Sequence, residues 1–363
     1  MDRVEEEIVS KKTSLLITLL ALSSLLLTAL PALAGVPEAM DWLRTQQNDD
    51  GGFGDPDSTV SNTADAVQAI VAAGEDPTTW DKGGHTPLTF LAANAPNLTM
   101  AGDTAKAVLA AVAAGENPRD FGGVDLVAAL EGTLGDDGKF GGENDFQFSH
   151  CLAILALKSV NRPIPAAAVD YLKQAQMEDG TWAWNFATTP GEGDNNSAGL
   201  AVMALVAAGE PADGEVIQKT IAHFQGQQND DGGFPYISPS PYGTDSDANS
   251  TAVVLQALIA AGQDPAAWVK GAANTPVTAL ASFQNEDGSF AWQLAAPEAN
   301  FLATVQAVPA LAGKVYPLAT TTVGEAAAPE TLPVTGADLL QHAGWLALAG
   351  LALAGGGLLL RRR

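Results

Sequence analysis

Two kinds of hydrophobic pattern alternate along the chain from residue 36 to residue 313. Segments of the first kind are apolar on nearly every helical face. Most of them open with Asn, Asp or Ser, which cap helix N-termini, and stop at Gly, often with Pro shortly after. This pattern predicts helices that are buried all round. These segments are residues 62–77, 103–118, 149–163, 196–211, 249–265 and 300–313.

Segments of the second kind carry charged residues on one side and apolar residues at helical spacing on the other. This pattern is typical of surface helices that lean on a core. Several have Pro near the first turn, where a helix tolerates it. The segments are residues 36–47, 85–95, 124–134, 166–176, 215–228 and 275–284.

Six buried helices that alternate with six amphipathic ones predict an all-α fold. An even set without a polar capping repeat favours a closed ring, in which inner helices surround an axis and outer helices surround them. An open superhelix of helix pairs is the alternative. We therefore predict an (α/α)6 toroid over residues 35–318.

A short motif, Gln-x-x-Asp-Gly-x-aromatic, joins the two kinds of segment. Copies occupy residues 47–53, 176–182, 228–234 and 284–290, and a fifth copy at 134–140 has Leu134 in place of Gln. Asp-Gly is a turn signal, since Gly takes positive φ. A calcium loop is the alternative, but Asn48, Asp49 and Asp50 are adjacent, whereas an EF-hand alternates its ligands. We interpret the motif as a turn between outer and inner helices.

This motif, preceded by an aromatic-Leu pair as in Trp42-Leu43 and Tyr171-Leu172, resembles the QW repeat of the terpene (squalene) cyclase and protein prenyltransferase superfamily. The resemblance covers roughly residues 36–316 and implies an α/α toroid. It agrees with the count of six helix pairs. The fold hosts both binders and enzymes, so the resemblance alone does not select a reaction.

Composition excludes several classes of function. The formal net charge of −25 and the absence of a basic stripe argue against nucleic acid as a partner. Cys151 is the only cysteine, so no internal disulfide and no four-Cys zinc site can form. In its apolar segment Cys151 is expected to be a small buried hydrophobe. We predict no cofactor and no metal.

Both ends of the chain read as sorting signals. Residues 1–34 form a predicted signal peptide, with Lys11 and Lys12 before an apolar run and Ala32-Leu33-Ala34 for cleavage. An uncleaved anchor is the alternative.

At the other end, residues 319–331 read as a linker. Residues 332–363 contain Leu332-Pro333-Val334-Thr335-Gly336, an apolar stretch able to span a bilayer, and a terminal run of arginines. The order resembles the LPxTG cell-wall sorting signal, which implies that a sortase cleaves after Thr335 and joins it to peptidoglycan. A plain C-terminal membrane anchor is the alternative. Either way, the body is expected outside the cell.

In a toroid the N-termini of all inner helices converge at one mouth, where polar side chains and helix dipoles make a default ligand site. Trp184 and Trp292, just beyond the turn aromatics, are candidates for its lip. The other candidates lie at the starts of the predicted inner helices, where each one also has a simpler role as a helix cap. They are Asp65, Asp103, His150, Asn196, Asp247 and Asn249.

Resemblance to squalene cyclases is strongest at residues 246–258. The cyclase motif Asp-x-Asp-Asp falls on Asp247-Ala248-Asn249-Ser250, so the position of the protonating acid holds Asn249, and an amide has no useful proton to give. The zinc set of protein prenyltransferases is also broken, because Ser149 replaces the Asp two residues before Cys151.

Two functions are therefore open. One is a non-catalytic, surface-anchored toroid that binds a small molecule or a surface partner. The other is an exported enzyme with a degenerate cyclase-like or carbohydrate-active site, the latter requiring paired carboxylates.

Overall fold

A computed structural model of the chain describes residues 35–241 and 243–323. The predicted signal peptide (1–34), the linker from residue 324 on and the predicted sorting signal (332–363) lie outside the described residues. None of the helices in the described part is both long and apolar enough to span a membrane. Residues up to Val323 belong to one compact unit.

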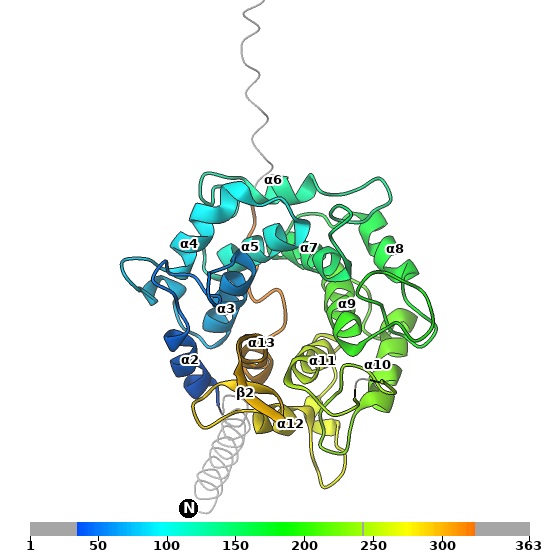
Figure 1. Ribbon diagram of the computed structural model, residues 1–363. Helices are drawn as coiled ribbons and strands as arrows, with labels where there is room; N and C mark the ends of the chain where they lie inside the picture. Colours follow the sequence, from blue (N-terminus) through cyan, green and yellow to red (C-terminus); the bar gives the residue numbers. More distant parts are fainter. Residues whose placement is uncertain (1–34, 242, 324–363) are drawn as a thin grey trace, which may run out of the picture. The chain divides into compact units, whose positions relative to one another are not determined.

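Six helices form an inner ring (Figure 1). Each packs against the next, and the last packs against the first, so that the ring is closed. The prediction of a closed toroid rather than an open superhelix is confirmed. The inner helices are α3 (Val60–Ala72), α5 (Ala101–Ala113), α7 (Gln147–Ser159), α9 (Asn195–Ala208), α11 (Ala248–Ala260) and α13 (Phe301–Leu311).

Six further helices surround the inner ring and alternate with it along the chain, as predicted (Figure 1). They are α2 (Val36–Thr45), α4 (Pro87–Asn94), α6 (Leu126–Glu131), α8 (Ala166–Gln174), α10 (Glu215–Gln227) and α12 (Pro276–Ser282). Three short 3-10 turns complete the layer: η2 (Pro77–Thr79), η3 (Ala95–Asn97) and η4 (Pro265–Ala267).

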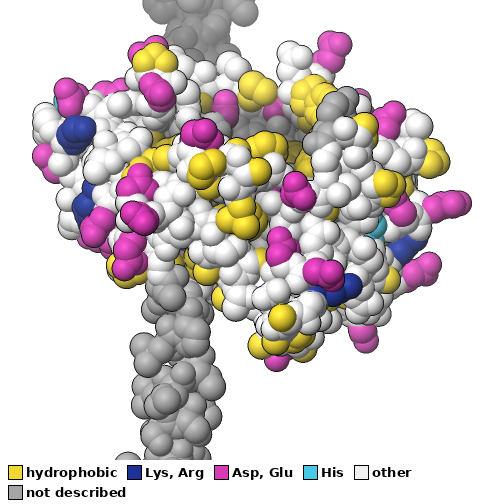
Figure 2. All heavy atoms as spheres, turned by 60° about the horizontal axis from the view of Figure 1, so that its bottom comes forward, with side chains coloured by type: hydrophobic (Ala, Val, Ile, Leu, Met, Phe, Trp, Pro, Cys, Tyr) yellow, Lys and Arg dark blue, Asp and Glu magenta, His cyan; other side chains and the backbone are white. Residues whose placement is uncertain are grey.

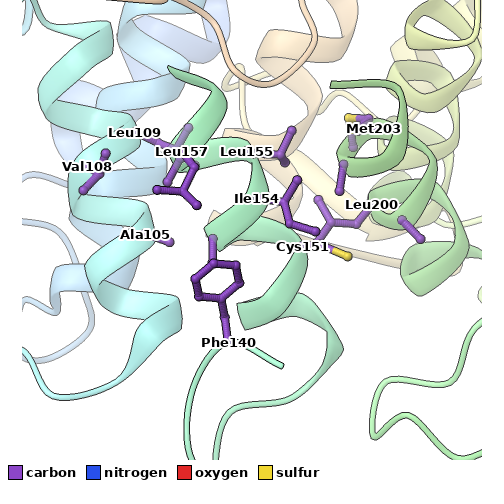
Figure 3. Packing of buried hydrophobic residues seen from close by; sticks show 14 of the residues in the cluster. Ala105, Val108, Leu109, Phe140, Cys151, Ile154, Leu155, Leu157, Leu200 and Met203 are labelled. Carbon is purple, nitrogen blue, oxygen red and sulfur yellow. The ribbon is translucent and has the colours of Figure 1, made fainter. Parts of the chain in front are cut away.

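The core lies between neighbouring inner helices and beneath the outer layer. Figure 3 shows side chains of α5, α7 and α9 packed together, among them Val108, Leu155 and Cys151. Cys151 is fully buried, as expected from its apolar segment. The surface is acidic: on the face in Figure 2, Asp and Glu side chains are spread widely and Lys and Arg are few.

The Gln-x-x-Asp-Gly-x-aromatic turns hold the two layers together. In the first copy, the Gln47 amide donates to Gly51 O in its own turn (3.0 Å) and to Trp80 O in the next helix pair (2.9 Å). Asp50 accepts the Gly52 N–H at 2.9 Å, and Phe53 is fully buried. Side chains that satisfy their own turn in this way support the scaffold interpretation.

The same joint closes the ring. Gln284 donates to Gly288 O (3.1 Å) and to Gly35 O (2.6 Å), which joins the last helix pair to the first. Gly288 has φ +90° and lies directly against the backbone of Glu38 in α2. A side chain there would collide with α2, so this position requires glycine for both its conformation and its close approach.

Two features were not predicted. A short antiparallel hairpin, β1 (Phe290–Gln293) and β2 (Ala296–Asn300), precedes α13. After α13, residues 314–323 cross the C-terminal ends of the inner helices, and we name them the C-terminal strap (Figure 1). Thr321 N–H donates to Ser159 O at 2.7 Å, and Gln256 donates to Lys314 O at 3.0 Å. Residues 319–323, assigned to the linker from sequence, therefore contact the ring.

Candidate functional site

A cavity of about 90 Å³ lies on the axis of the inner ring. A cavity needs roughly 10–15 Å³ to hold one water, so several waters fit. Each inner helix contributes at least one side chain, chiefly from its second and third turns, and Tyr316 of the strap also lines the space. The lining residues are Ala64, Asp65, Gln68, Lys106, Leu109, Phe148, Leu152, Leu200, Met203, Val253, Gln256, Val305, Gln306 and Tyr316.

An ion pair lies in the wall of this axial cavity. Lys106 Nζ on α5 is 2.6 Å from Asp65 Oδ2 on α3 and donates to Ser61 Oγ at 2.9 Å. Asp103 lies in the first turn of α5. Burial raises the pKa of Asp103, and the nearby Asp145 and Asp65 add to this, while Lys106 opposes it. The structure thus brings Asp65 and Asp103 together, with Lys106 between acidic neighbours.

Three glutamines add polar groups to the cavity wall. Gln256 donates to Lys314 O of the strap, and Gln306 accepts a hydrogen bond from Asn249 at 2.7 Å. Gln68 is only 4% exposed, and neither its Nε2 nor its Oε1 has a partner among the described residues. Burial, together with the Asp65 charge, raises the pKa of the Tyr316 hydroxyl.

The residues matched to the cyclase motif have structural partners. Asp247 caps α11, because its carboxylate accepts from the backbone N–H and the hydroxyl of Ser250 at 2.7 and 2.8 Å. Burial raises the pKa of Asp247 to about 6, against the lowering effect of the Ser250 hydrogen bonds. Asn249, two residues on, donates to Gln306 beside the cavity. Asp247 itself does not line the cavity.

A second copy of this arrangement begins α9. Asp194 caps the helix through the N–H and hydroxyl of Ser197, both at 2.7 Å. Burial raises the pKa of Asp194 as well. Asn196, half-buried, is two residues beyond its cap, as Asn249 is, and its Oδ1 has no partner among the described residues.

His150 is placed differently from the sequence-based expectation. It was expected at the mouth, but its Nδ1 accepts the Phe140 N–H and its Nε2 bonds Ala168 O, both at 3.0 Å. The ring is therefore held between α7 and α8, and burial lowers the pKa of His150 to about 4. The reason is register: α7 begins at Gln147, so His150 lies a full turn inside the helix rather than at its start. A group of three His, Cys, Asp or Glu residues suited to a metal ion is not found in the described part of the chain.

Large exposed hydrophobic residues surround the N-terminal end of the inner ring. Trp184 and Trp292, predicted at the lip, are 47% and 46% exposed. The backbone carbonyl of Trp184 accepts from Gln147 N–H, which places it at the start of α7. We name this set the apolar rim. It contains Met100, Phe146, Phe148, Trp184, Tyr236, Trp292, Leu294 and Leu302.

Sequence reasoning missed the polar side chains that face the axis. Lys106, Gln68, Gln256 and Gln306 each interrupt an otherwise apolar inner helix, and that interruption was the available signal. A polar residue inside an all-round apolar helix must find a partner or line a cavity. Of the residues predicted at the mouth, Asp65 lines the cavity and Asn249 lies beside it, whereas Asp247 caps α11 through its hydrogen bonds to Ser250.

Comparisons with known proteins agree with this architecture. The Prenyltransferase alpha-alpha toroid domain matches residues 9–216, and the Squalene-hopene cyclase C-terminal domain matches residues 145–303. Squalene–hopene cyclase of Zymomonas mobilis is 34% identical over 154 residues, which cover 39% of this chain and 21% of that enzyme. The match therefore spans about a fifth of the enzyme's length.

Among solved structures, the type II terpene cyclase MstE from Scytonema aligns with a TM-score of 0.55 at 16% identity, covering 78% of this chain and 97% of that one. A protein from Actinoplanes aligns with a TM-score of 0.52, also at 16% identity, covering 78% of this chain and 98% of that one. At this identity the likeness concerns the fold.

Proposed function

We propose that this chain, which belongs to the prenyltransferase alpha-alpha toroid family, is an exported, surface-anchored protein. We propose further that it binds a ligand without transforming it. The observation that carries this proposal is Asn249. It stands where the cyclase motif has its acid, and its amide is engaged by Gln306. An alkene accepts a proton only from a strong, positioned acid, and an amide is not one.

Three carboxyl groups on or at the start of the inner helices are engaged in other roles. Asp65 forms an ion pair with Lys106 at 2.6 Å. Asp194 and Asp247 cap α9 and α11. The axial cavity is also small and offers few aromatic faces, with Phe148 and Tyr316 as its aromatic lining. A cation formed inside would have little stabilisation.

One observation favours the alternative, an exported enzyme with a degenerate site. The pKa of Asp247 is raised to about 6, so this carboxyl holds a proton in mildly acidic conditions. A raised pKa is a property of catalytic acids, although buried structural carboxyls share it.

A turnover assay separates the two. The full-length protein is incubated with squalene and with geranylgeranyl dihydroxybenzoate, the substrate bound by MstE, and products are followed by mass spectrometry. The Zymomonas enzyme serves as the positive control. We expect no cyclised product from the wild type or from Asp247→Asn. A wild-type product that Asp247→Asn abolishes would establish the enzyme instead.

Export and anchoring are tested separately. The proposal rests on the signal-like N-terminus and on Leu332-Pro333-Val334-Thr335-Gly336. We expect the mature chain to begin at Gly35 and its last peptide to end at Thr335, joined to peptidoglycan. Recovery of an intact Arg363 terminus in the membrane fraction would instead indicate a plain membrane anchor.

A further inference from the structure

The most informative group in the axial cavity is the Gln68 amide. Its side chain is almost fully buried and lines the cavity, yet both its donor and its acceptor lack partners among the described residues. Buried polar groups in folded proteins are nearly always hydrogen-bonded, so an unpaired amide facing a cavity calls for a partner that enters the cavity.

The other polar groups in the same wall are already engaged. Gln256 donates to the strap carbonyl of Lys314, and Gln306 accepts from Asn249. Lys106 is neutralised by Asp65 at 2.6 Å. Among the described residues that line the cavity, no cation is left over to hold an anionic head group such as a diphosphate.

The opposite wall is apolar. Leu152 of α7, together with Leu200 and Met203 of α9, faces the space from the side away from α3, and Leu109 and Val253 complete the wall. A ligand that fits must therefore combine an apolar body with one uncharged polar end. That end must both donate to and accept from a single primary amide.

We propose that the axial cavity binds a small neutral amphiphile whose polar end pairs with the Gln68 amide and whose alkyl part lies on the apolar wall. The apolar rim at the N-terminal end gives such a molecule a compatible entrance. The inference rests on the proposed function and names the class of ligand that this function requires.

Hexanamide is the probe, because its amide matches Gln68 and its short chain suits a small cavity. Its binding to the full-length protein is measured by titration calorimetry, with hexylamine and hexanoate as charged counterparts of equal length. We expect saturable binding of hexanamide and binding at least tenfold weaker for both ions. Equal or tighter binding of hexylamine or hexanoate would overturn the neutral-ligand assignment.

Gln68→Leu keeps the volume and removes the amide. We expect it to weaken hexanamide binding roughly tenfold, which corresponds to about 1.4 kcal/mol, without lowering the thermal midpoint of the free protein. Gln256→Leu is the matched control in the same wall. Because Gln256 has a partner, its loss should lower the midpoint. Gln68→Met is a second variant should leucine not be accommodated.

A fall in the midpoint on Gln68→Leu comparable to that of the control would show that Gln68 is a structural residue and overturn the inference. The same conclusion follows if hexanamide binds the wild type and Gln68→Leu equally, or fails to saturate the wild type. These outcomes are distinct from failure of the proposed function, which would appear as product formation in the turnover assay.

Discussion

Substituting Gly288 should open the seam of the ring. In Gly288→Ala the new Cβ would lie 2.5 Å from the carbonyl carbon of Glu38, closer than real Cβ contacts allow. The backbone of α2 must therefore move away, and the bond from Gln284 to Gly35 is lost with it. Gly74→Ala is the matched control, since Gly74 has φ +84° and its Cβ would meet nothing within 4 Å.

Both glycine variants place alanine at positive φ, but only Gly288→Ala also disturbs the contact with α2. Placing alanine at positive φ costs about 1–2 kcal/mol in each. Gly288→Ala additionally loses a hydrogen bond of about 1 kcal/mol and part of the packing at the seam, where Ala39 and Leu280 are nearly fully buried. We expect a loss of about 1 kcal/mol for Gly74→Ala and about 3 kcal/mol for Gly288→Ala.

The assay is equilibrium unfolding in urea, followed by far-ultraviolet circular dichroism and by tryptophan fluorescence. Coincident transitions for the two probes are needed before free energies are compared. Gln284→Leu removes the seam hydrogen bond alone, and its effect should not add fully to that of Gly288→Ala. If the two glycine variants lose equal stability, the close approach at the seam contributes nothing and the reasoning is refuted.

Two other predictions concern charge. The pKa of Asp247 is raised to about 6, so Asp247 keeps its proton to higher pH in the folded state than in the unfolded state. Its contribution to stability therefore falls as pH rises from about 4 to 6. The pKa of His150 is lowered to about 4, so the contribution of His150 to stability increases as pH rises from about 4 to 6.5. In Asp247→Asn the free energy of unfolding should therefore rise with pH across this window, and in His150→Gln it should fall. Urea unfolding at a series of pH values measures both. If both variants keep the pH profile of the wild type, these two pKa shifts are contradicted. Lys106→Met should destabilise the protein by about 1–3 kcal/mol because it leaves Asp65 unpaired at the cavity wall, and adding Asp65→Leu should restore part of that loss in thermal unfolding. Strictly additive losses would show that the pair does not interact.

The architecture could be predicted from the sequence because the segments that form the inner helices are apolar on nearly every face. Segments that are apolar on all faces have one stable location in a helical protein, the layer between an axis and an outer coat. The repeated turn supplied the order of the layers. The hairpin before α13 was missed because residues 290–300 follow a turn identical in pattern to the others, and nothing in that turn announces a pair of strands.

The starts of the inner helices were placed too late. Thr59, rather than Asn62, caps α3, and its hydroxyl accepts the Asn62 N–H at 3.1 Å. Asp194 and Asp247 cap α9 and α11 two residues before Asn196 and Asn249. Asn300, the cap of α13, was placed correctly. A shift of two or three residues along a helix changes the direction of a side chain by much of a full rotation. His150 therefore points toward α8 and not into the predicted mouth.

The axial cavity could not be predicted from the sequence, because it depends on contacts between helices that hydrophobic periodicity does not encode. The pairing of Lys106 with Asp65 joins two helices through side chains, and Tyr316 reaches the axis from a strap that the sequence marked as the end of the body. What the sequence did contain was the set of isolated polar residues in apolar helices, which marks the axis once the ring is known.

The hydrogen bond between Gln284 and Gly35 also affects which helix pair can open locally before the others. In an open stack of helix pairs, each terminal repeat has a single neighbour and opens first, so amide hydrogen exchange is fastest at the ends. Here the bond from the last pair to the first gives every repeat two neighbours. Exchange should therefore be as slow in α13 and α3 as in α7, on the far side of the ring, and unfolding has no preferred starting repeat.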